Sequence, residues 1–311
     1  MPIRVQSDLP ARNVLERENI FVMTEKRAAT QDIRPLKIAI VNLMPTKEAT
    51  ETQLLRLLGN TPLQIDISLV RMEDHEPSHV SGEHLERFYI PSSEIFNHKF
   101  DGMIITGAPV EQMPFEQVDY WDELCRIMDY ARKNVFSTLC ICWGAQAGLY
   151  HNYKIPKKTL PQKLFGILPN RRVLQSDPLM RGFDDIFHVP TSRHTTVDRA
   201  FIERERELII LAENLEGEVT LSKSADNRSI FMMGHLEYDA GTLAHEYERD
   251  KERGLPVGMP RNYFPADDPA RQPLNSWRST AHLFYSNWLN YYVSQETPYD
   301  FFDGGYFDAG L

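Results

Sequence analysis

Four apolar runs alternate with helical segments in the first half of this chain, and this alternation limits the folds that it can adopt. The runs cover residues 36–44, 63–72, 101–109 and 135–142, and helices are expected over 47–59 and 118–134. The run over 63–72 alternates between apolar and polar residues, as in a strand with one solvated or lightly covered face. Strands of a parallel sheet are covered by helices on both faces, so they give apolar runs of this kind. The sequence therefore predicts an α/β fold: a doubly wound, mostly parallel sheet flanked by helices.

The second half of the chain continues with shorter elements. Strands are expected over 208–214, 218–224 and 229–235, and helices over 240–254 and 276–293, with a proline-rich loop between these two helices. We predict one α/β domain over 36–297, preceded by an extended N-terminal arm over 1–35 and followed by an acidic, aromatic tail over 298–311.

Charge and composition exclude several classes of protein. The 311 residues carry a formal net charge of −10, which argues against general nucleic-acid binding. No apolar run approaches the roughly 20 residues that span a bilayer, and the N-terminus lacks the apolar segment of a signal peptide. The three cysteines lie between 125 and 142, too few and too close for a disulfide framework or a zinc site. We therefore expect a protein of the reducing cytoplasm, with no bound metal and no membrane partner.

Three strand ends are candidate parts of a site. In open α/β sheets, ligands bind at the carboxyl ends of the strands, near the point where the strand order reverses. Met44–Pro45, Gly107–Ala108 and Cys142–Gly144 each close a predicted buried strand. We expect these ends to lie along one edge of the sheet.

The stretch STLCICWGAQAGLY (137–150) places Cys142 at a turn from strand to helix. A cysteine held there lies at the N-terminus of the following helix, whose dipole favours the reactive thiolate. Gly144 permits the close approach that such a turn needs. Cys142 could equally be a small buried apolar residue, as free cysteines often are. Cys140, two positions earlier, is expected to share a strand face with Cys142 and to serve as core packing.

A general base and its orienting carboxylate are expected at His235 and Glu237. His235 follows the apolar strand SIFMMG, and Glu237 lies two residues further on. A carboxylate at this spacing can hold the imidazole in one tautomer and stabilise the imidazolium. The pair could also be an ordinary strand end, but its combination with Cys142 points to covalent catalysis.

These motifs together resemble the class I glutamine amidotransferase-like superfamily, in which a cysteine elbow is followed about ninety residues later by His-x-Glu. Here Cys142 and His235 are 93 residues apart. Amidotransferases usually carry glycine two residues before the nucleophile, whereas this chain has Cys140, and this departure disfavours an amidotransferase proper.

A second resemblance extends over about residues 1–297. The stretches MPIRVQSDLPARNVLERENIFVM, IAIVNLMPTKEATETQLLRLLGNTPLQ, DGMIITGAPVE, CWGAQAGLY, GHLEYD, NYFP and NSWRSTAHLFYSNWLNYYV resemble homoserine O-acyltransferases of the methionine pathway. The resemblance implies transfer of an acyl group from acyl-coenzyme A to the hydroxyl of L-homoserine. Both are small-molecule substrates, and no permanently bound cofactor is implied. The resemblance leaves a monomer or a homodimer open.

The same resemblance assigns roles to individual residues. It implies Cys142 as nucleophile, His235 as base and Glu237 as orienting carboxylate. Substrate contacts are implied for Lys163, Ser192 and Arg249, and acyl selection for Glu111 together with Ser192. We expect the oxyanion to be held by the backbone amide of Trp143 and by an amide after Gly107, at Ala108.

Glu111 makes acetyl-CoA the expected acyl donor. In the resembling family, glycine at this position accompanies succinyl transfer and glutamate accompanies acetyl transfer. A carboxylate in the acyl pocket would repel the terminal carboxylate of a succinyl group. The basic stretch 153–172, which contains no acidic residue, is either a phosphate-binding surface for coenzyme A or a solvated loop.

Three alternatives share parts of this evidence. A homoserine O-succinyltransferase would use the same machinery with another donor. A glutamine amidotransferase-type amide hydrolase would share Cys142, His235 and Glu237, but would leave Glu111 without a role. A non-catalytic binding protein of the same fold would not need the cysteine at all.

Overall fold

The structure is a computed structural model that describes residues 3–4, 8–18, 34–75, 82–174 and 176–295. Its strands are β1 (Ile3–Arg4), β2 (Leu36–Val41), β3 (Ile65–Arg71), β4 (Tyr89–Pro91), β5 (Phe100–Ile105), β6 (Val135–Ile141), β7 (Lys157–Arg172), β8 (Ile186–Val197), β9 (Leu208–Asn214), β10 (Val219–Ser224) and β11 (Ser229–Met232). Its α-helices are α1 (Pro10–Arg17), α3 (Lys47–Leu58), α4 (Gly82–Phe88), α5 (Ser92–Ile95), α6 (Trp121–Asn134), α7 (Trp143–Tyr153), α8 (Arg199–Arg204), α9 (Thr242–Glu252) and α10 (Arg278–Asn287). Short 3₁₀ turns lie at Phe115–Gln117, Pro178–Met180 and Pro265–Asp267, and a π-helical segment, η4 (Trp288–Ser294), continues α10.

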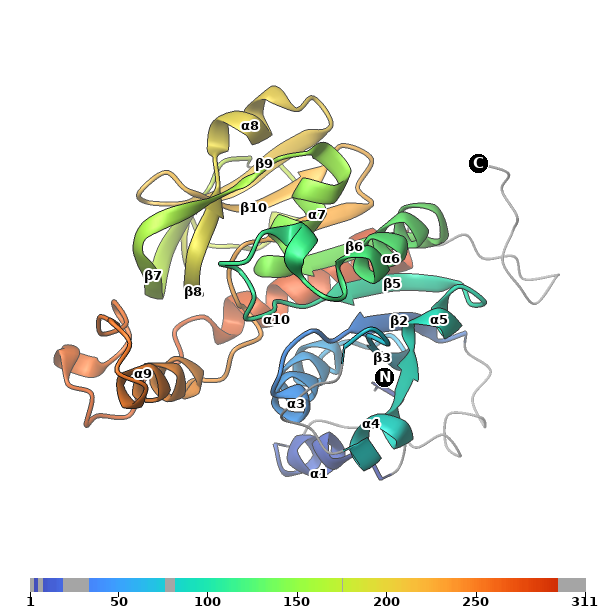
Figure 1. Cartoon of the computed structure of the whole chain (residues 1–311), viewed down its shortest axis with the longest axis horizontal. Helices are drawn as coiled ribbons and strands as arrows, with labels where there is room; N and C mark the ends of the chain where they lie inside the picture. Colours follow the sequence, from blue (N-terminus) through green and yellow to red (C-terminus); the bar gives the residue numbers. More distant parts are fainter. Residues whose placement is uncertain (1–2, 5–7, 19–33, 76–81, 175, 296–311) are drawn as a thin grey trace.

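These strands form one sheet with a parallel and an antiparallel half (Figure 1). The order is β1-β3-β2-β5-β6-β11-β10-β9-β7-β8, with β4 added beside β3. The pairs from β1 to β11 are parallel, and those from β11 through β10, β9 and β7 to β8 are antiparallel. The fold class predicted from the sequence is thus confirmed, and the carboxyl ends of β5, β6 and β11 lie side by side.

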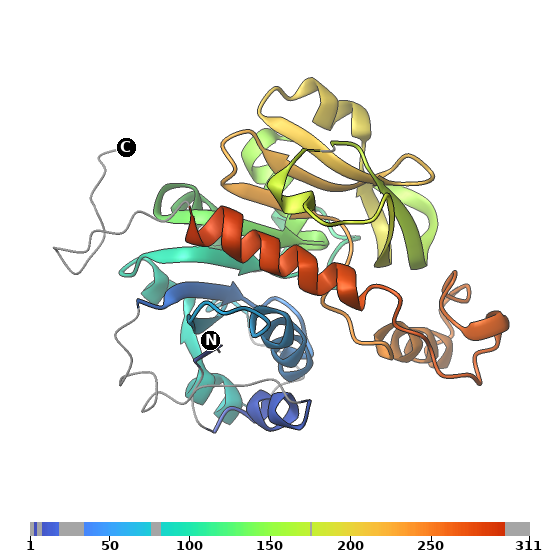
Figure 2. The same ribbon diagram turned by 180° about the vertical axis from the view of Figure 1, so that it is seen from behind.

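Two buried apolar clusters cover the two faces of the sheet. On one face Ile38 and Ile40 of β2 pack with α3 and α10, and on the other Ala39 and Val41 pack with α6 and α7. The alternation along β2 is the period of two that a strand buried on both faces requires. Figure 2 shows α10 lying along the sheet on the face opposite α6 and α7.

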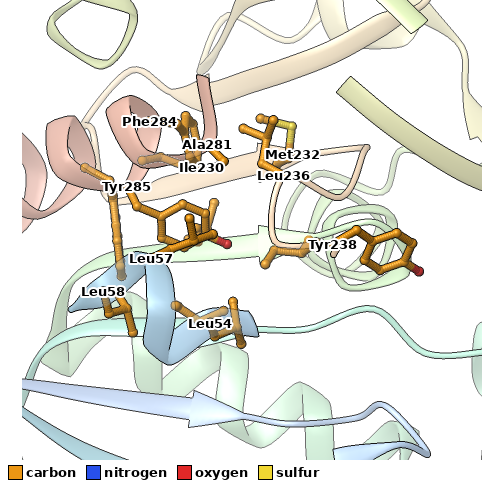
Figure 3. Packing of buried hydrophobic residues seen from close by; sticks show 14 of the residues in the cluster. Leu54, Leu57, Leu58, Ile230, Met232, Leu236, Tyr238, Ala281, Phe284 and Tyr285 are labelled. Carbon is orange, nitrogen blue, oxygen red and sulfur yellow. The ribbon is translucent and has the colours of Figure 1, made fainter. Parts of the chain in front are cut away.

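The first cluster reaches the segment that follows β11. Figure 3 shows Leu54 and Leu58 of α3, Phe284 of α10 and Ile230 of β11 packed together, with Leu236 and Tyr238 continuing the packing beyond the strand. Leu236 is 2% exposed, so the chain around it is fixed by core contacts on the side away from solvent. This packing holds the loop that carries His235.

The N-terminal residues differ from the extended arm that we expected. Residues 10–17 form α1, and Leu15 is fully buried against the first cluster. Pro10 begins the helix, a position where proline costs no hydrogen bond. Burial of Leu9, Ala11 and Leu15 on one side of this short segment explains why it is helical.

The basic stretch 153–172 is mainly the strand β7, and β8 pairs with it in an antiparallel hairpin. The proline-rich segment before α10 is tied to β7, because Arg261 donates to Phe165 O at 2.9 Å and accepts from Ile167 N at 2.8 Å. A side chain at Gly166 would lie 2.3 Å from Arg261 N, so only glycine allows this approach. The expected tail over 298–311 lies outside the described residues.

Candidate active site

Cys142 lies at a sharp turn between β6 and α7. The strand ends at Ile141, and Cys142 has φ 51° and ψ −112°, a conformation that costs free energy for any residue other than glycine. Its amide donates to Met232 O of the neighbouring strand β11 at 2.7 Å, which holds the turn in place. Cys142 is 7% exposed. This is the geometry of a nucleophile elbow.

Gly144 allows α7 to start so close to the sheet. A Cβ at this position would lie 2.6 Å from Thr106 O and 2.8 Å from Ile105 O, both backbone atoms that follow or end β5. Since backbone atoms cannot rotate away, a larger residue would push the helix off the strand ends. The glycine therefore sets the height of Cys142 above the sheet.

The prediction that Cys140 and Cys142 share a strand face is wrong. Cys140 packs in the cluster beneath α6 and α7, whereas Cys142 belongs to the cluster on the other face. The reason is the positive φ of Cys142, which ends the strand alternation at Ile141. Burial raises the pKa of the Cys140 thiol to about 12, so at neutral pH this thiol stays protonated and serves as core packing.

His235 and Glu237 meet Cys142 as the sequence predicts. The side chain of Cys142 lies beside the imidazole of His235, close enough to raise its pKa. The ring nitrogen Nδ1 of His235 donates to Glu237 Oε1 at 2.6 Å. Both residues are buried, at 3% and 7% exposure. A Cβ on Gly107 would lie 3.3 Å from both Cys142 Cβ and His235 Cε1, so the end of β5 completes the same small space.

The electrostatics of this trio favour a charged imidazole. Burial alone would lower the pKa of His235. Cys142 and Glu237 oppose this effect through their charges and through hydrogen bonding, and together they raise the pKa well above its ordinary value. The imidazolium is therefore the form of His235 that this arrangement stabilises. Such a group can donate a proton to a leaving group and later remove one from an attacking hydroxyl.

Tyr238 supports His235 from a further side, which the sequence did not reveal. Its ring stacks on the imidazole with centroids 4.1 Å apart and planes 15° apart. Its hydroxyl donates to Glu246 Oε1 of α9 at 3.0 Å. The stacking fixes the plane of the imidazole, and the hydroxyl connects it to the next group of charged residues.

The two amides that we expect to hold an oxyanion lie beside the elbow. Trp143 is the first residue of α7, and Ala108 follows Gly107 after β5. Within the described part of the chain, neither amide donates a hydrogen bond to another backbone group. Both are therefore available to a ligand, although their role stays a prediction.

The three predicted substrate contacts belong to one polar cluster built by β7, β8 and α9. Ser192 Oγ donates to Glu246 Oε2 at 2.5 Å. Lys163 Nζ donates to Asp250 Oδ2 at 2.9 Å and lies 3.7 Å from Glu246 Oε2. Arg249 forks onto Asp250 Oδ1 with two bonds of 2.9 and 2.7 Å. The structure thus joins Lys163 and Arg249 through a shared carboxylate.

Glu246 and Asp250 were not predicted as site residues, because in HEYERDKER they resemble the solvated face of a charged helix. Their spacing of four puts both on one side of α9, facing β7 and β8. Burial alone would raise the pKa of Asp250, but hydrogen bonds from Lys163 and Arg249 outweigh burial and lower it. The cluster therefore offers cationic and anionic groups side by side.

Glu111 lies in the turn after β5, and its carboxylate is bound to β8. Glu111 Oε2 accepts hydrogen bonds from His194 N at 2.8 Å, from Thr195 N at 3.1 Å and from Thr195 Oγ1 at 3.1 Å. Thr195 Oγ1 also lies 2.8 Å from Gln146 Oε1 of α7. Gln146 comes four residues after Cys142 on the elbow helix, so Glu111 is linked to that helix.

Most basic residues of the 153–172 stretch are paired with acids. Lys158 pairs with Asp198, Arg171 with Glu213, and Arg172 with Asp185. Lys157 differs: it lies over the Phe115 ring at 4.2 Å and donates to Met113 O. Burial lowers the pKa of Lys157 to about 8, against the opposing effect of Glu111 and Glu116.

Comparison with known sequences places the chain in a family. A family model described as homoserine O-succinyltransferase matches residues 2–299. The chain belongs to this family. Proteins named homoserine O-acetyltransferase from Geobacillus sp. (strain WCH70) and Desulfovibrio desulfuricans are each 58% identical, over 96% of this chain and 99% and 95% of their own lengths. Members of this family are acyltransferases by name, and the chain is accordingly an enzyme.

Solved structures agree on the fold. A glutamine amidotransferase from Thermotoga maritima has a TM-score of 0.51 at 12% identity, covering 82% of this chain and 97% of that chain. A glutamine amido transferase from Methylobacillus flagellatus has a TM-score of 0.52 at 12% identity, covering 83% and 95%. At such identity these similarities establish a glutamine amidotransferase-like fold and nothing about chemistry.

In the described residues, no helix is long and apolar enough to cross a membrane, and no group of three or more possible ligands could hold a metal ion.

Proposed function

We propose that this chain transfers an acetyl group from acetyl-CoA to the hydroxyl of L-homoserine in the cytoplasm, giving O-acetyl-L-homoserine and coenzyme A for methionine biosynthesis. The observation that carries the proposal is the convergence of Cys142, His235 and Glu237 at adjacent strand ends in a chain of this family. The names of relatives at 55–58% identity support acetyl rather than succinyl transfer.

The first half-reaction forms an acyl-enzyme. The Cys142 thiolate attacks the thioester carbonyl, and the amides of Trp143 and Ala108 stabilise the oxyanion that forms. The intermediate collapses by breaking the bond to the coenzyme A sulfur, which takes a proton from the His235 imidazolium. The acetyl group is then held as a thioester on Cys142, and His235 is neutral.

The second half-reaction passes the acetyl group to homoserine. Neutral His235 accepts the proton of the homoserine hydroxyl while its oxygen attacks the Cys142 thioester. Collapse of the second oxyanion releases the ester and restores the Cys142 thiolate beside the His235 imidazolium. Glu237 holds Nδ1 throughout, so the nitrogen facing Cys142 is the one that exchanges the proton.

The polar cluster suits a zwitterionic acceptor. Homoserine has a carboxylate, which Lys163 and Arg249 can bind, and an ammonium group, which Glu246 and Asp250 can bind. Ser192 and Tyr238 both donate to Glu246, so this carboxylate is already oriented before a substrate enters. Tyr238 also stacks on His235, and this contact supports an acceptor site next to the base.

Glu111 and Lys157 suggest how the acyl donor is recognised. Two like charges about 4 Å apart repel by about 4 kcal/mol at an intermediate dielectric, so a carboxylate at Glu111 would reject succinyl and accept acetyl. Lys157 lies near Glu111 and carries no carboxylate partner in the described residues, so it is our candidate for a coenzyme A phosphate.

Steady-state assays of the purified enzyme with L-homoserine test this proposal. We expect acetyl-CoA to be turned over with a higher kcat/KM than succinyl-CoA, and Glu111→Gly to shift the ratio towards succinyl-CoA. A higher kcat/KM for succinyl-CoA with the unaltered enzyme would make it a succinyltransferase. Release of ammonia from glutamine without acyl transfer would instead favour an amide hydrolase.

A further inference from the structure

Glu111 does not project freely into a pocket. One of its oxygens, Oε2, accepts three hydrogen bonds from His194 and Thr195 of β8, two from backbone amides and one from the Thr195 hydroxyl. A carboxylate bound in this way is held in one position and keeps its negative charge there. The electrostatic effect of Glu111 on a bound acyl group therefore depends on the residues that hold it.

The Thr195 hydroxyl has two acceptors but a single proton. Its Oγ1 lies 3.1 Å from Glu111 Oε2 and 2.8 Å from Gln146 Oε1. Donation to a carboxylate is the stronger of the two bonds. If the proton goes to Glu111, the Gln146 amide must turn so that its nitrogen donates to Thr195 Oγ1. The positions of amide O and N atoms are assigned from such networks, and the turned orientation gives up the 3.4 Å hydrogen bond from Gln146 Nε2 to Thr195 O.

Thr195 and Gln146 also connect Glu111 to the nucleophile. Gln146 is fully buried on α7, four residues after Cys142, and its Nε2 lies 3.4 Å from Thr195 O. Thr195 itself is 2% exposed. The hydrogen bonds from Glu111 through Thr195 to Gln146 thus fix the distance between the carboxylate and the elbow helix. The side chains of Thr195 and Gln146 are both buried.

We propose that Thr195 is a positioning residue for acyl selection, which acts by holding the Glu111 carboxylate at a fixed place relative to the elbow helix through Gln146. This inference rests on the proposed function of Glu111. The acyl preference then belongs to the Glu111–Thr195 pair, and loss of the hydroxyl weakens the preference even though Glu111 is still present.

A double-mutant comparison tests the inference. The ratio of kcat/KM for acetyl-CoA to kcat/KM for succinyl-CoA is measured for the unaltered enzyme, Thr195→Val, Glu111→Gly and the double variant. Valine keeps the shape and strand preference of threonine but lacks the hydroxyl. One hydrogen bond to a charged group corresponds to about a 10- to 100-fold effect, so we expect Thr195→Val to lower the ratio by about 10-fold.

Three further results are expected if Thr195 acts through Glu111. Thr195→Val leaves the ratio unchanged when Glu111 is already glycine, because there is no carboxylate to hold. Thr195→Ser, which keeps the hydroxyl, restores the ratio. Thr196→Val, a matched control at the next buried threonine of β8, does not change it.

Specific outcomes would overturn the inference. If Glu111→Gly shifts the ratio and Thr195→Val does not, the inference fails while the function of Glu111 stands. If Thr195→Val changes the kcat/KM ratio equally with glutamate and with glycine at position 111, its effect is a general structural one and the inference fails. If Glu111→Gly itself leaves the ratio unchanged, both the role of Glu111 and the inference fail. Thr195→Ser and Thr195→Ala provide the same comparison should the valine variant not fold.

Discussion

His235 is subject to two opposing effects that decide the chemistry of the site. Its burial penalises a positive charge, whereas Cys142 and Glu237 stabilise that charge and prevail, so the pKa of His235 is raised well above its ordinary value. Glu237 Oε2 has no hydrogen-bond partner among the described residues. Within that part of the chain, the Glu237 carboxylate therefore makes one hydrogen bond, from His235 Nδ1 to Oε1. Glu237 is therefore the carboxylate that stabilises the imidazolium, alongside the effect of Cys142.

Glu237→Gln removes the charge but keeps the shape of the side chain. We expect kcat to fall by about 100- to 10,000-fold, because the amide can no longer stabilise the imidazolium or select its tautomer. The rate of iodoacetamide labelling of Cys142 at pH 7 should fall too, because the positive charge that Glu237 stabilises on His235 beside the sulfur is lost. Asp239→Asn, two residues away and bound to Arg56 at the surface, is the matched control and should retain activity. Full activity of Glu237→Gln would contradict the role given to Glu237.

At the scale of single elements, the regular strands and helices of the parallel half could be predicted from sequence, because burial on both faces gives continuous apolar runs. The elbow could be predicted from Cys142 and Gly144, and the base from His235 and Glu237. The hairpin of β7 and β8 could not, since β7 contains Pro161, Pro169 and several cations that resemble a loop. The contacts of Glu246, Asp250 and Thr195 depend on that hairpin and on α9, so no local pattern reveals them.

Gly144→Ala tests how the elbow helix is seated. Its Cβ would lie within 2.8 Å of two backbone oxygens that cannot move aside, so α7 must shift. We expect a loss of about 1–3 kcal/mol in the free energy of unfolding and about a 100-fold fall in kcat/KM, since a shift of about 1 Å at Cys142 can have this effect. Gly258→Ala, where a Cβ meets nothing within 4 Å, should change neither quantity. Normal activity of Gly144→Ala would refute the close approach.

Lys47, at the start of α3, makes the free energy of unfolding depend on pH. Burial lowers its pKa to about 8, although Glu51 opposes this, and its Nζ donates to Asn42 O at 2.6 Å. The unfolded chain holds this proton up to about pH 10.4, so between pH 8 and 10 the unfolded state binds more protons and stability rises with pH. The slope from this group approaches about 1.4 kcal/mol per pH unit.

Lys47→Met removes that term. Urea unfolding at several pH values should show a smaller rise in stability between pH 8 and 10 than the unaltered protein shows. Lys133→Met, at an exposed lysine near the end of α6, should leave the slope as it was. An identical slope for Lys47→Met and the unaltered protein would mean that Lys47 titrates normally.

At the scale of the whole molecule, the site joins the two halves of one sheet. The parallel half supplies the elbow after β6 and His235 after β11, whereas the antiparallel half and α9 supply the polar cluster and hold Glu111. In the function that we propose, acyl donor and acceptor meet the same sulfur from neighbouring surfaces. This arrangement predicts that the acetyl group stays bound to Cys142 as a thioester after coenzyme A has left.

The most direct test of this account is to incubate the enzyme with acetyl-CoA in the absence of homoserine and to measure its intact mass and the modified peptide. The account predicts one acetyl group per chain, on Cys142, with an equal amount of coenzyme A released, and loss of the adduct when L-homoserine is added. Full turnover by an enzyme that never carries acetyl on Cys142, or by Cys142→Ala, would contradict it.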